Sequence, residues 1–298
     1  MISVATREER VFKTFAVAFL AIASTCAFLP FFLIVATSLT SERAIVADGY
    51  RFIPQEISLD AYEFMFAQAR VIFRAYAVSI CVTVAGTAAS MLFTTMLAYP
   101  MSRSDFKYRN VIAFLVFFTL LFSGGVVPSY IMWTRLFHLR DTYWALIIPT
   151  YLVSGFNVLL VRNFYKNSIP SALVESAQID GAGEFTIFFK IMVPLSLPVN
   201  VTIGLFTALA YWNDWINALY YISKPQMFGI QNLLMRMMTN LQFLTSGQAA
   251  GMVSGAVEVP TNAVRMSMAV IGVLPIVIGY PFLQKYLTKG VVVGAVKG

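Results

Sequence analysis

The residues best placed for chemistry lie in the segment ESAQIDGAGEFTIFFKIMVPLSLP, residues 175–198. It carries the carboxylates Glu175 and Asp180, then a Gly-x-Gly, an aromatic run and two prolines four residues apart. Leu173, Ala177 and Gly181 recur at i, i+4 and i+8, which places small or modest side chains on one face of a helix. Such a face lets another surface come close.

The elements that position these residues are two short helices. We expect the first over residues 170–181, because Pro170 suits an opening turn and Gly181 can end a helix in a left-handed conformation. The second would carry an apolar stripe, with Pro194 and Pro198 marking the return into an apolar segment. The stripe consists of Phe185, Phe188, Phe189 and Met192. The spacing fits an amphipathic hairpin tucked under a bundle as well as a docking element, and does not distinguish them.

Motifs for enzyme chemistry are missing from the sequence. The chain has one histidine, His138, and no H-E-x-x-H, which argues against an intramembrane metalloprotease. No G-x-x-x-x-G-K-[ST] occurs, so this chain would not cradle ATP phosphates in the P-loop manner. Cys26 and Cys81 both fall in apolar segments and are expected to be packing residues. We predict a non-catalytic chain without a metal or cofactor of its own.

The composition identifies a lipid-embedded protein. The 298 residues are 59% hydrophobic and 12% charged, against about 25% charged in an average soluble domain. A bilayer span needs about 20 predominantly apolar residues. The apolar runs predict an all-α membrane protein with six transmembrane helices in one domain, 1–298, with a loop over 163–196. The predicted spans lie near 12–38, 75–100, 111–133, 142–162, 197–221 and 266–284.

Lysine and arginine predict the orientation of the spans. If the N-terminus is cytoplasmic, the segments on that side hold most of the lysines, and Lys224 is the one lysine left outside. Both termini and residues 163–196 are then cytoplasmic. The net charge of +7 is explained by basic residues at span ends, where they meet anionic lipid headgroups, so no nucleic-acid partner is expected.

A second candidate site lies in the sequence YWNDW of the predicted fifth span. Asp214 is costly to expose to lipid and is expected to face the bundle interior or water. With Asn213 and Asn217 it offers donors and acceptors either to sugar hydroxyls or to a closed gate, and the gate is the interpretation that we favour. Trp212 fits an interfacial aromatic belt or a sugar-stacking wall. Asn157 fits helix–helix hydrogen bonding or pathway lining.

The segment 175–198 resembles the "EAA" cytoplasmic loop of ATP-binding-cassette importer permeases. Glu175, Ala177, Asp180, Gly181 and Ala182 match its pattern, as do both prolines, whereas Ser176 replaces an alanine. The sequences SGGVVPSY, YWNDW and YPFLQKYLTKGVVVGAVKG are similar to those of the carbohydrate-uptake branch of this family, typified by the maltose importer. The SGGVVPSY variant resembles a subgroup that includes permeases for polysaccharide fragments, alginate among them.

The resemblance implies the partners and the division of labour. A second permease would complete the pathway, two ATPase subunits would bind the ATP and magnesium, and an extracytoplasmic solute-binding protein would deliver the sugar. Residues 170–181 would be the coupling helix, with Glu175, Ser176, Ala177, Asp180, Gly181 and Ala182 facing an ATPase. The ending GAVKG resembles tails that reach toward the ATPases. The alternatives are an ion-coupled secondary transporter and a non-transporting structural subunit.

Overall fold

The computed structural model describes residues 7–245 and 261–295, with side chains defined for 8–243 and 261–281. Within these ranges the chain is helical, and its extended pairing is limited to an isolated antiparallel bridge between Thr40 and Ile57. This confirms the predicted all-α fold. The side chains of the ending GAVKG, and residues 246–260, lie outside the described residues.

The helices of the described chain range in length from 3 to 35 residues. They are α1 (Arg7–Ser38), α2 (Glu42–Asp48), α3 (Asp60–Phe66), α4 (Ala69–Ser102), α5 (Arg109–Leu121), α6 (Val126–Ile131), the π-helix η1 (Met132–Leu136), α7 (Trp144–Ile147), α8 (Gly155–Ser168), α9 (Ser171–Ile179), α10 (Glu184–Ile187), the π-helix η2 (Phe188–Met192), α11 (Val193–Leu195), α12 (Leu197–Trp212), α13 (Ile216–Tyr221), the 3₁₀-helix η3 (Pro225–Met227), α14 (Ile230–Thr245) and α15 (Thr261–Ala295).

Three of these helices are long and apolar enough to cross a bilayer alone. They are α1, α4 and α15, at the predicted spans 12–38, 75–100 and 266–284. The 34 residues of α4 make a rod of about 51 Å at 1.5 Å per residue. Most apolar side chains of α1 are exposed, as expected for a helix whose neighbours are lipid or another subunit.

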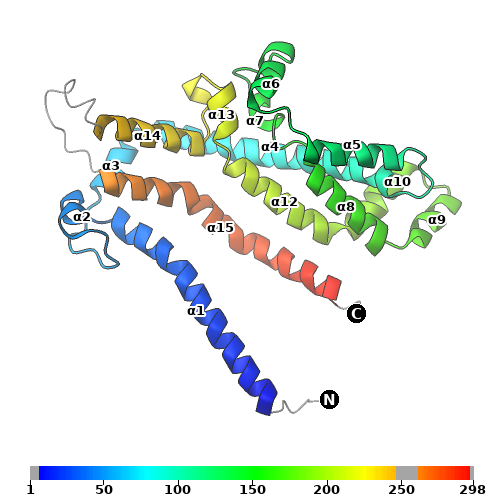
Figure 1. Cartoon of the computed structure of the whole chain (residues 1–298), viewed down its shortest axis with the longest axis horizontal. Helices are drawn as coiled ribbons and strands as arrows, with labels where there is room; N and C mark the ends of the chain where they lie inside the picture. Colours follow the sequence, from blue (N-terminus) through cyan, green and yellow to red (C-terminus); the bar gives the residue numbers. More distant parts are fainter. Residues whose placement is uncertain (1–6, 246–260, 296–298) are drawn as a thin grey trace. The chain divides into compact units, whose positions relative to one another are not determined.

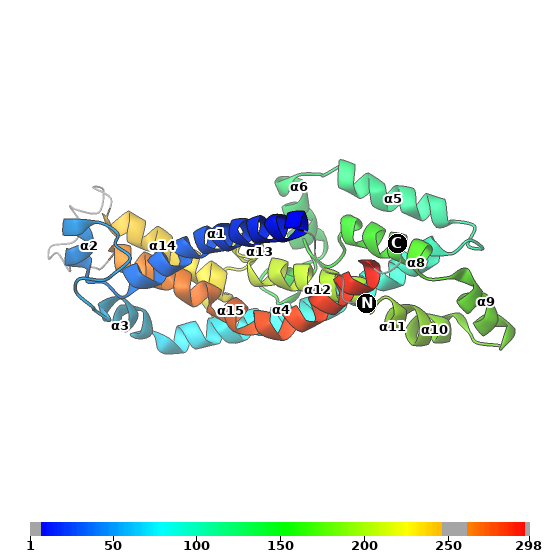
Figure 2. The same ribbon diagram turned by 90° about the horizontal axis from the view of Figure 1, so that it is seen from below.

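Two bent pairs of helices are further candidate spans. Arg109–Leu121 and Val126–Leu136 meet at 115°, and Glu184–Leu195 meets Leu197–Trp212 at 80°. Figure 2 shows the first bend, where the chain turns from α5 into α6. Gly125 allows it because its φ of 81° lies in the left-handed region. The described residues thus give three spans, or up to five if each bent pair is one, and the predicted count of six is not confirmed.

The predicted fourth span, 142–162, is wrong as a continuous helix. Only α7 and α8 are helical there, and the chain between them leaves the helix at residues 148–154. Pro149 explains the break, because it has no backbone N–H and its ring excludes a continuing helix. The carbonyls around the break have partners: the Tyr211 hydroxyl donates to the Ile147 oxygen at 2.8 Å, and the Ser90 hydroxyl to the Tyr151 oxygen at 3.0 Å.

The described chain forms two compact units, and whether they make up the predicted single domain stays a prediction. The first comprises the chain up to Ala69 together with Met238–Pro275. Within it the Glu42 carboxylate accepts hydrogen bonds from the backbone N–H groups of Asn262 and Ala263, each at 3.0 Å. Glu42 thereby caps the first turn of α15, where the N–H groups have no partners within the helix.

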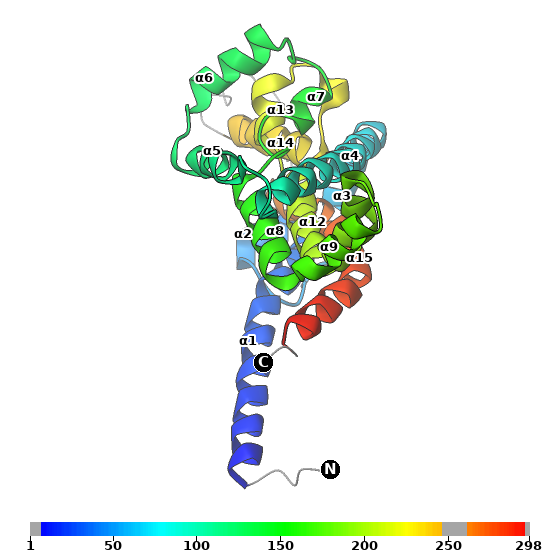
Figure 3. The same ribbon diagram turned by 90° about the vertical axis from the view of Figure 1, so that its right-hand side faces the viewer.

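The second unit comprises Arg70–Met237 and Ile276–Gly298 and holds two apolar cores. One core joins α4, α7 and α13, and α7 and α13 lie side by side in Figure 3. The other joins the last turns of α4 to α8, α9, η2 and α12. In Figures 1 and 2, α9 lies at the end of this unit, beyond α8 and α10. The second core therefore supports the predicted docking element.

Candidate functional site

The predicted coupling helix is α9, Ser171–Ile179, with Pro170 at its N-cap. Its end is a Schellman motif: the Gly181 N–H donates to the Gln178 oxygen at 3.0 Å, and the Ala182 N–H to the Ala177 oxygen at 2.9 Å. Gly181 has a φ of 80°, so the predicted left-handed end is confirmed. This motif gives the turn after α9 a fixed geometry.

One face of α9 is buried and the other is open. Val174 packs into the core, and Ala177 and Ala182 lie partly buried against it. Glu175, Ser176, Asp180 and Gly181 are exposed. Their side of the loop also carries Ile179, which is 86% exposed, so an apolar group stands beside two carboxylates. The structure thus places the six predicted coupling residues in α9 and the turn that follows it, where four of them are exposed and Ala177 and Ala182 face the core. The exposed side has the mixed polar and apolar character typical of protein docking.

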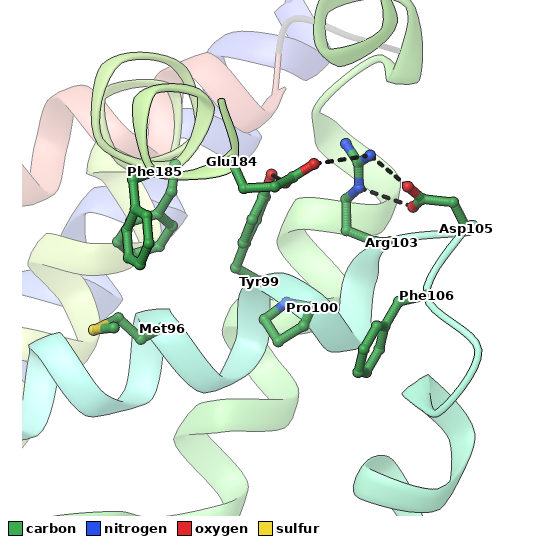
Figure 4. A pocket seen from close by; sticks show the side chains of 9 residues that line it. Met96, Tyr99, Pro100, Arg103, Asp105, Phe106, Glu184 and Phe185 are labelled. Atoms are coloured by element: carbon green, nitrogen blue, oxygen red, sulfur yellow. Dashed lines mark hydrogen bonds and ion pairs between the residues drawn. The ribbon is translucent and has the colours of Figure 1, made fainter. Parts of the chain in front are cut away.

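Glu184, the first residue of α10, joins this loop to α4 and was missed by sequence reasoning. The Tyr99 hydroxyl donates to Glu184 Oε2, and Gln178 Nε2 of α9 donates to Glu184 Oε1 at 3.2 Å. Arg103 Nη2 lies 3.8 Å from Oε1. Figure 4 shows Tyr99 and Arg103 pointing toward the Glu184 carboxylate. The sequence signal was only an acidic residue in the first turn of a short helix.

Arg103 is itself held in a fixed position. Its Nε donates to Asp105 Oδ1 at 3.0 Å and its Nη2 to Oδ2 at 2.8 Å, a bidentate pair. Hydrogen bonding to Arg103 lowers the pKa of the Asp105 carboxyl, so it stays ionised at neutral pH. Arg103, Asp105 and Glu184 line one side of a cavity of about 410 Å³. Its other walls are mostly apolar and include Met96, Phe106 and Phe185 (Figure 4).

The structure divides the second candidate site. Asp214 Oδ1 accepts from the backbone N–H groups of Ile216 and Asn217, both at 3.1 Å, and so caps α13. Asn217 is 3% exposed, and its Oδ1 accepts from the Thr150 hydroxyl at 2.8 Å, which ties α13 to the break between α7 and α8. Asn213 instead is exposed and donates to the Leu209 oxygen at 2.9 Å. Asp214 and Asn217 therefore hold α13 in place, whereas Asn213 bonds back to the last turn of α12.

The remaining two candidates lie inside the second unit. Trp212 is 6% exposed and stacks on Tyr76, with ring centroids 6.3 Å apart. Asn157 Nδ2 of α8 lies 3.5 Å from the Thr207 hydroxyl of α12, at the outer limit of a hydrogen bond. Both contacts join helices of this chain.

Two loops of the second unit are fastened by Asp141. Its carboxylate accepts from the Ser223 N–H and hydroxyl, both at 2.6 Å, and from the Lys224 N–H at 3.2 Å. These hydrogen bonds lower the pKa of the Asp141 carboxyl. Exposed cations lie on the fastened loops or next to them, namely Arg135, Arg140 and Lys224.

The described chain thus combines apolar candidate spans, broken helices and an exposed, capped helix α9. The chain belongs to the family of binding-protein-dependent transport system inner membrane components, whose profile matches residues 90–293. Within this family it is a sugar permease subunit of an ABC transporter.

Similar proteins support this membership. The polygalacturonan/rhamnogalacturonan transport system permease protein YtcP of Bacillus subtilis (strain 168) is 39% identical, over 98% of this chain and 100% of the relative. The arabinooligosaccharides transport system permease protein AraQ of the same organism is 31% identical, over 82% and 81%. A chain in the crystal structure of a bacterial ABC transporter involved in the import of the acidic polysaccharide alginate matches with a TM-score of 0.77 and 29% identity. It covers 94% of this chain and 98% of that one.

Proposed function

We propose that this permease carries oligosaccharides of acidic sugars, such as uronic-acid oligomers, across the bacterial cytoplasmic membrane. YtcP is named for polygalacturonan and the structural neighbour for alginate, and both polymers are acidic. Exposed Arg135, Arg140 and Lys224 near the loops fastened by Asp141 favour an anionic substrate, since clustered cations raise its local concentration.

The observation that carries the mechanism is the Schellman-capped helix α9 with its exposed carboxylates. We infer that α9 sits against one of two ATPase subunits, and that Glu175 and Asp180 meet basic or hydrogen-bonding groups there. Nucleotide-driven closure of the ATPases would then displace α9. The spans attached to α9 would move with it as rigid bodies, between a state open to one side of the membrane and a state open to the other. ATP and magnesium would belong to the ATPases, and no cofactor to this chain.

The rest of the assembly follows from the same proposal. A second homologous permease would enclose the pathway, and an extracytoplasmic solute-binding protein would deliver the sugar to the face that carries Asp141. Both termini and the loop 163–196 would be cytoplasmic, in accordance with the lysine distribution. Asp214 and Asn217 would keep the gate closed by holding α13 against the break between α7 and α8. Trp212, Asn213 and Asn157 stay candidates for the pathway.

Reconstitution tests this function. The complete complex is placed in lipid vesicles with ATP inside, and uptake of trigalacturonate is compared with uptake of neutral arabinotriose. We expect ATP-dependent uptake of the acidic sugar and no uptake by the isolated chain. Preference for arabinotriose would refute the acidic substrate. Uptake by the isolated chain under a proton gradient would refute the ATP-driven mechanism.

A further inference from the structure

We propose that Glu184 is a positioning residue that makes α9 and the long helix α4 move as one body. The proposal rests on the proposed docking of an ATPase on α9. It identifies which contact transmits that movement to the spans, and it depends on a polar network of the second unit that joins elements 85 residues apart in sequence.

The loop that contains α9 is attached to the last turn of α4 at both of its ends. Before α9 in the chain, Arg162 Nε of α8 donates to the Met101 oxygen of α4 at 3.0 Å. After α9, Glu184 accepts from the Tyr99 hydroxyl. Because α4 is one continuous helix of 34 residues, a displacement applied to this turn acts along the whole rod.

Apolar packing also joins α9 to the end of α4. Val174 of α9 is buried in the core that contains Tyr99 and Met101 of α4. Tyr99 meets Phe188 at a ring-centroid distance of 5.4 Å. Hydrogen bonds to a carboxylate are directional and short, so they add a defined polar register to this apolar contact.

Glu184 is the member of the network that contacts Tyr99, Gln178 and Arg103. One oxygen takes the Tyr99 hydroxyl from α4, and the other takes Gln178 Nε2 from α9 and lies 3.8 Å from Arg103. Arg103 is fixed in turn by Asp105. Removal of the Glu184 carboxylate therefore breaks the α9 branch and the α4 branch together, whereas removal of the Tyr99 hydroxyl breaks the α4 branch alone.

The experiment uses the complete complex in vesicles, with trigalacturonate and arabinotriose as the sugars. Tyr99→Phe keeps the ring that packs on Phe188 and removes only the hydroxyl, and Glu184→Ala removes the carboxylate. For both we expect bound ATPase and basal hydrolysis as in the wild type. We expect the sugar transported per ATP hydrolysed to fall about fivefold or more, because hydrogen bonds to charged groups are among the stronger ones. Glu184→Gln, which can still accept from Tyr99, should recover part of the loss.

A control and a double variant separate positioning from general damage. Tyr108→Phe makes the same chemical change at an exposed phenol of the adjoining loop and should leave coupling unchanged. Tyr99→Phe combined with Glu184→Ala should be no worse than Glu184→Ala alone, because the hydroxyl acts through the carboxylate. Wild-type coupling in Glu184→Ala, or independent effects that multiply in the double variant, would overturn the proposal. A wild-type complex whose hydrolysis does not respond to sugar would instead refute the proposed function and this role with it.

Discussion

Replacement of Gly181 by residues of graded size and backbone preference tests whether α9 is a docking helix. Gly181 has a φ of 80°, and a Cβ built there meets nothing within 4 Å in this chain. Any cost inside the chain therefore comes from the backbone. A left-handed conformation costs about 1–2 kcal/mol for alanine, and more for β-branched valine. Asparagine adopts it far more readily, although its side chain is larger than that of alanine.

The three substitutions therefore separate backbone strain from crowding by a partner. If glycine is needed only for its φ, the loss should follow the order Val, Ala, Asn, with Asn close to the wild type. If an ATPase approaches closely, Gly181→Asn should also weaken docking, because overpacking a packed contact costs about 1–3 kcal/mol, or roughly 5- to 150-fold in affinity. We expect the second pattern, with membrane insertion and pairing of the two permeases intact.

The assay measures ATPase binding to the reconstituted permease pair, together with the hydrolysis that the sugar-loaded binding protein stimulates. Gly183→Ala is the matched control, because Gly183 is also exposed and free of contacts within 4 Å but has an ordinary φ of −71°. Binding and stimulated hydrolysis at wild-type levels in Gly181→Asn would refute close contact at this glycine. Equal loss in Gly183→Ala would show that the effect is not specific to the cap.

Three further predictions concern other parts of the second unit. Gly86→Ala should lower the free energy of unfolding of the purified protein by about 1–3 kcal/mol, because the alanine Cβ would lie 2.6 Å from Tyr211 Cζ. Asp141→Asn should lower the unfolding midpoint at pH 7, and the difference should disappear as the pH falls below about 4. The carboxylate, whose pKa is lowered, gives stability above its unfolded pKa and loses it on protonation. Asp214→Ala should preserve insertion but alter uptake or basal ATP hydrolysis, since it removes the oxygen that caps the turn holding Asn217.

Each of these has a control or a contradicting result. Gly204→Ala should be nearly neutral, because its Cβ would meet Met91 Sδ at an ordinary 3.8 Å, and equal destabilisation would refute the crowding argument. Asparagine also tolerates the φ of 57° at Asp141, so a difference that persists unchanged at pH 3 would show that the charge is not its cause. Unaltered uptake and hydrolysis in Asp214→Ala would refute a role of Asp214 in the gate.

Local sequence signals predicted the features whose cause is local. Apolar length located α1, α4 and α15, because a span requires only enough apolar residues in a row. The glycine that ends α9 was predicted because a left-handed residue after a helix has a strong preference for glycine. Pro194 and Pro198 stand near the starts of α11 and α12, where a missing N–H costs nothing.

The features that sequence reasoning missed depend on partners far along the chain. The break between α7 and α8 lies in a run as apolar as the other spans, and the side chains that satisfy its carbonyls come from α4 and α12. Likewise, nothing near Glu184 in the sequence points to Tyr99. Hydrophobic periodicity reports which face a helix buries, but not which polar groups meet across the bundle.

The break between α7 and α8 has a consequence for the synthesis of the protein. Backbone carbonyls at membrane depth need hydrogen-bond partners, because lipid offers none. Ser90 precedes the break in the chain, whereas Tyr211, which satisfies the Ile147 carbonyl, follows 64 residues later. At about 5–20 residues per second, that partner leaves the ribosome about 3–13 s after the carbonyl it serves. We therefore expect the nascent segment to stay in contact with water or with the insertion machinery during this interval, and to reach its final position when α12 arrives.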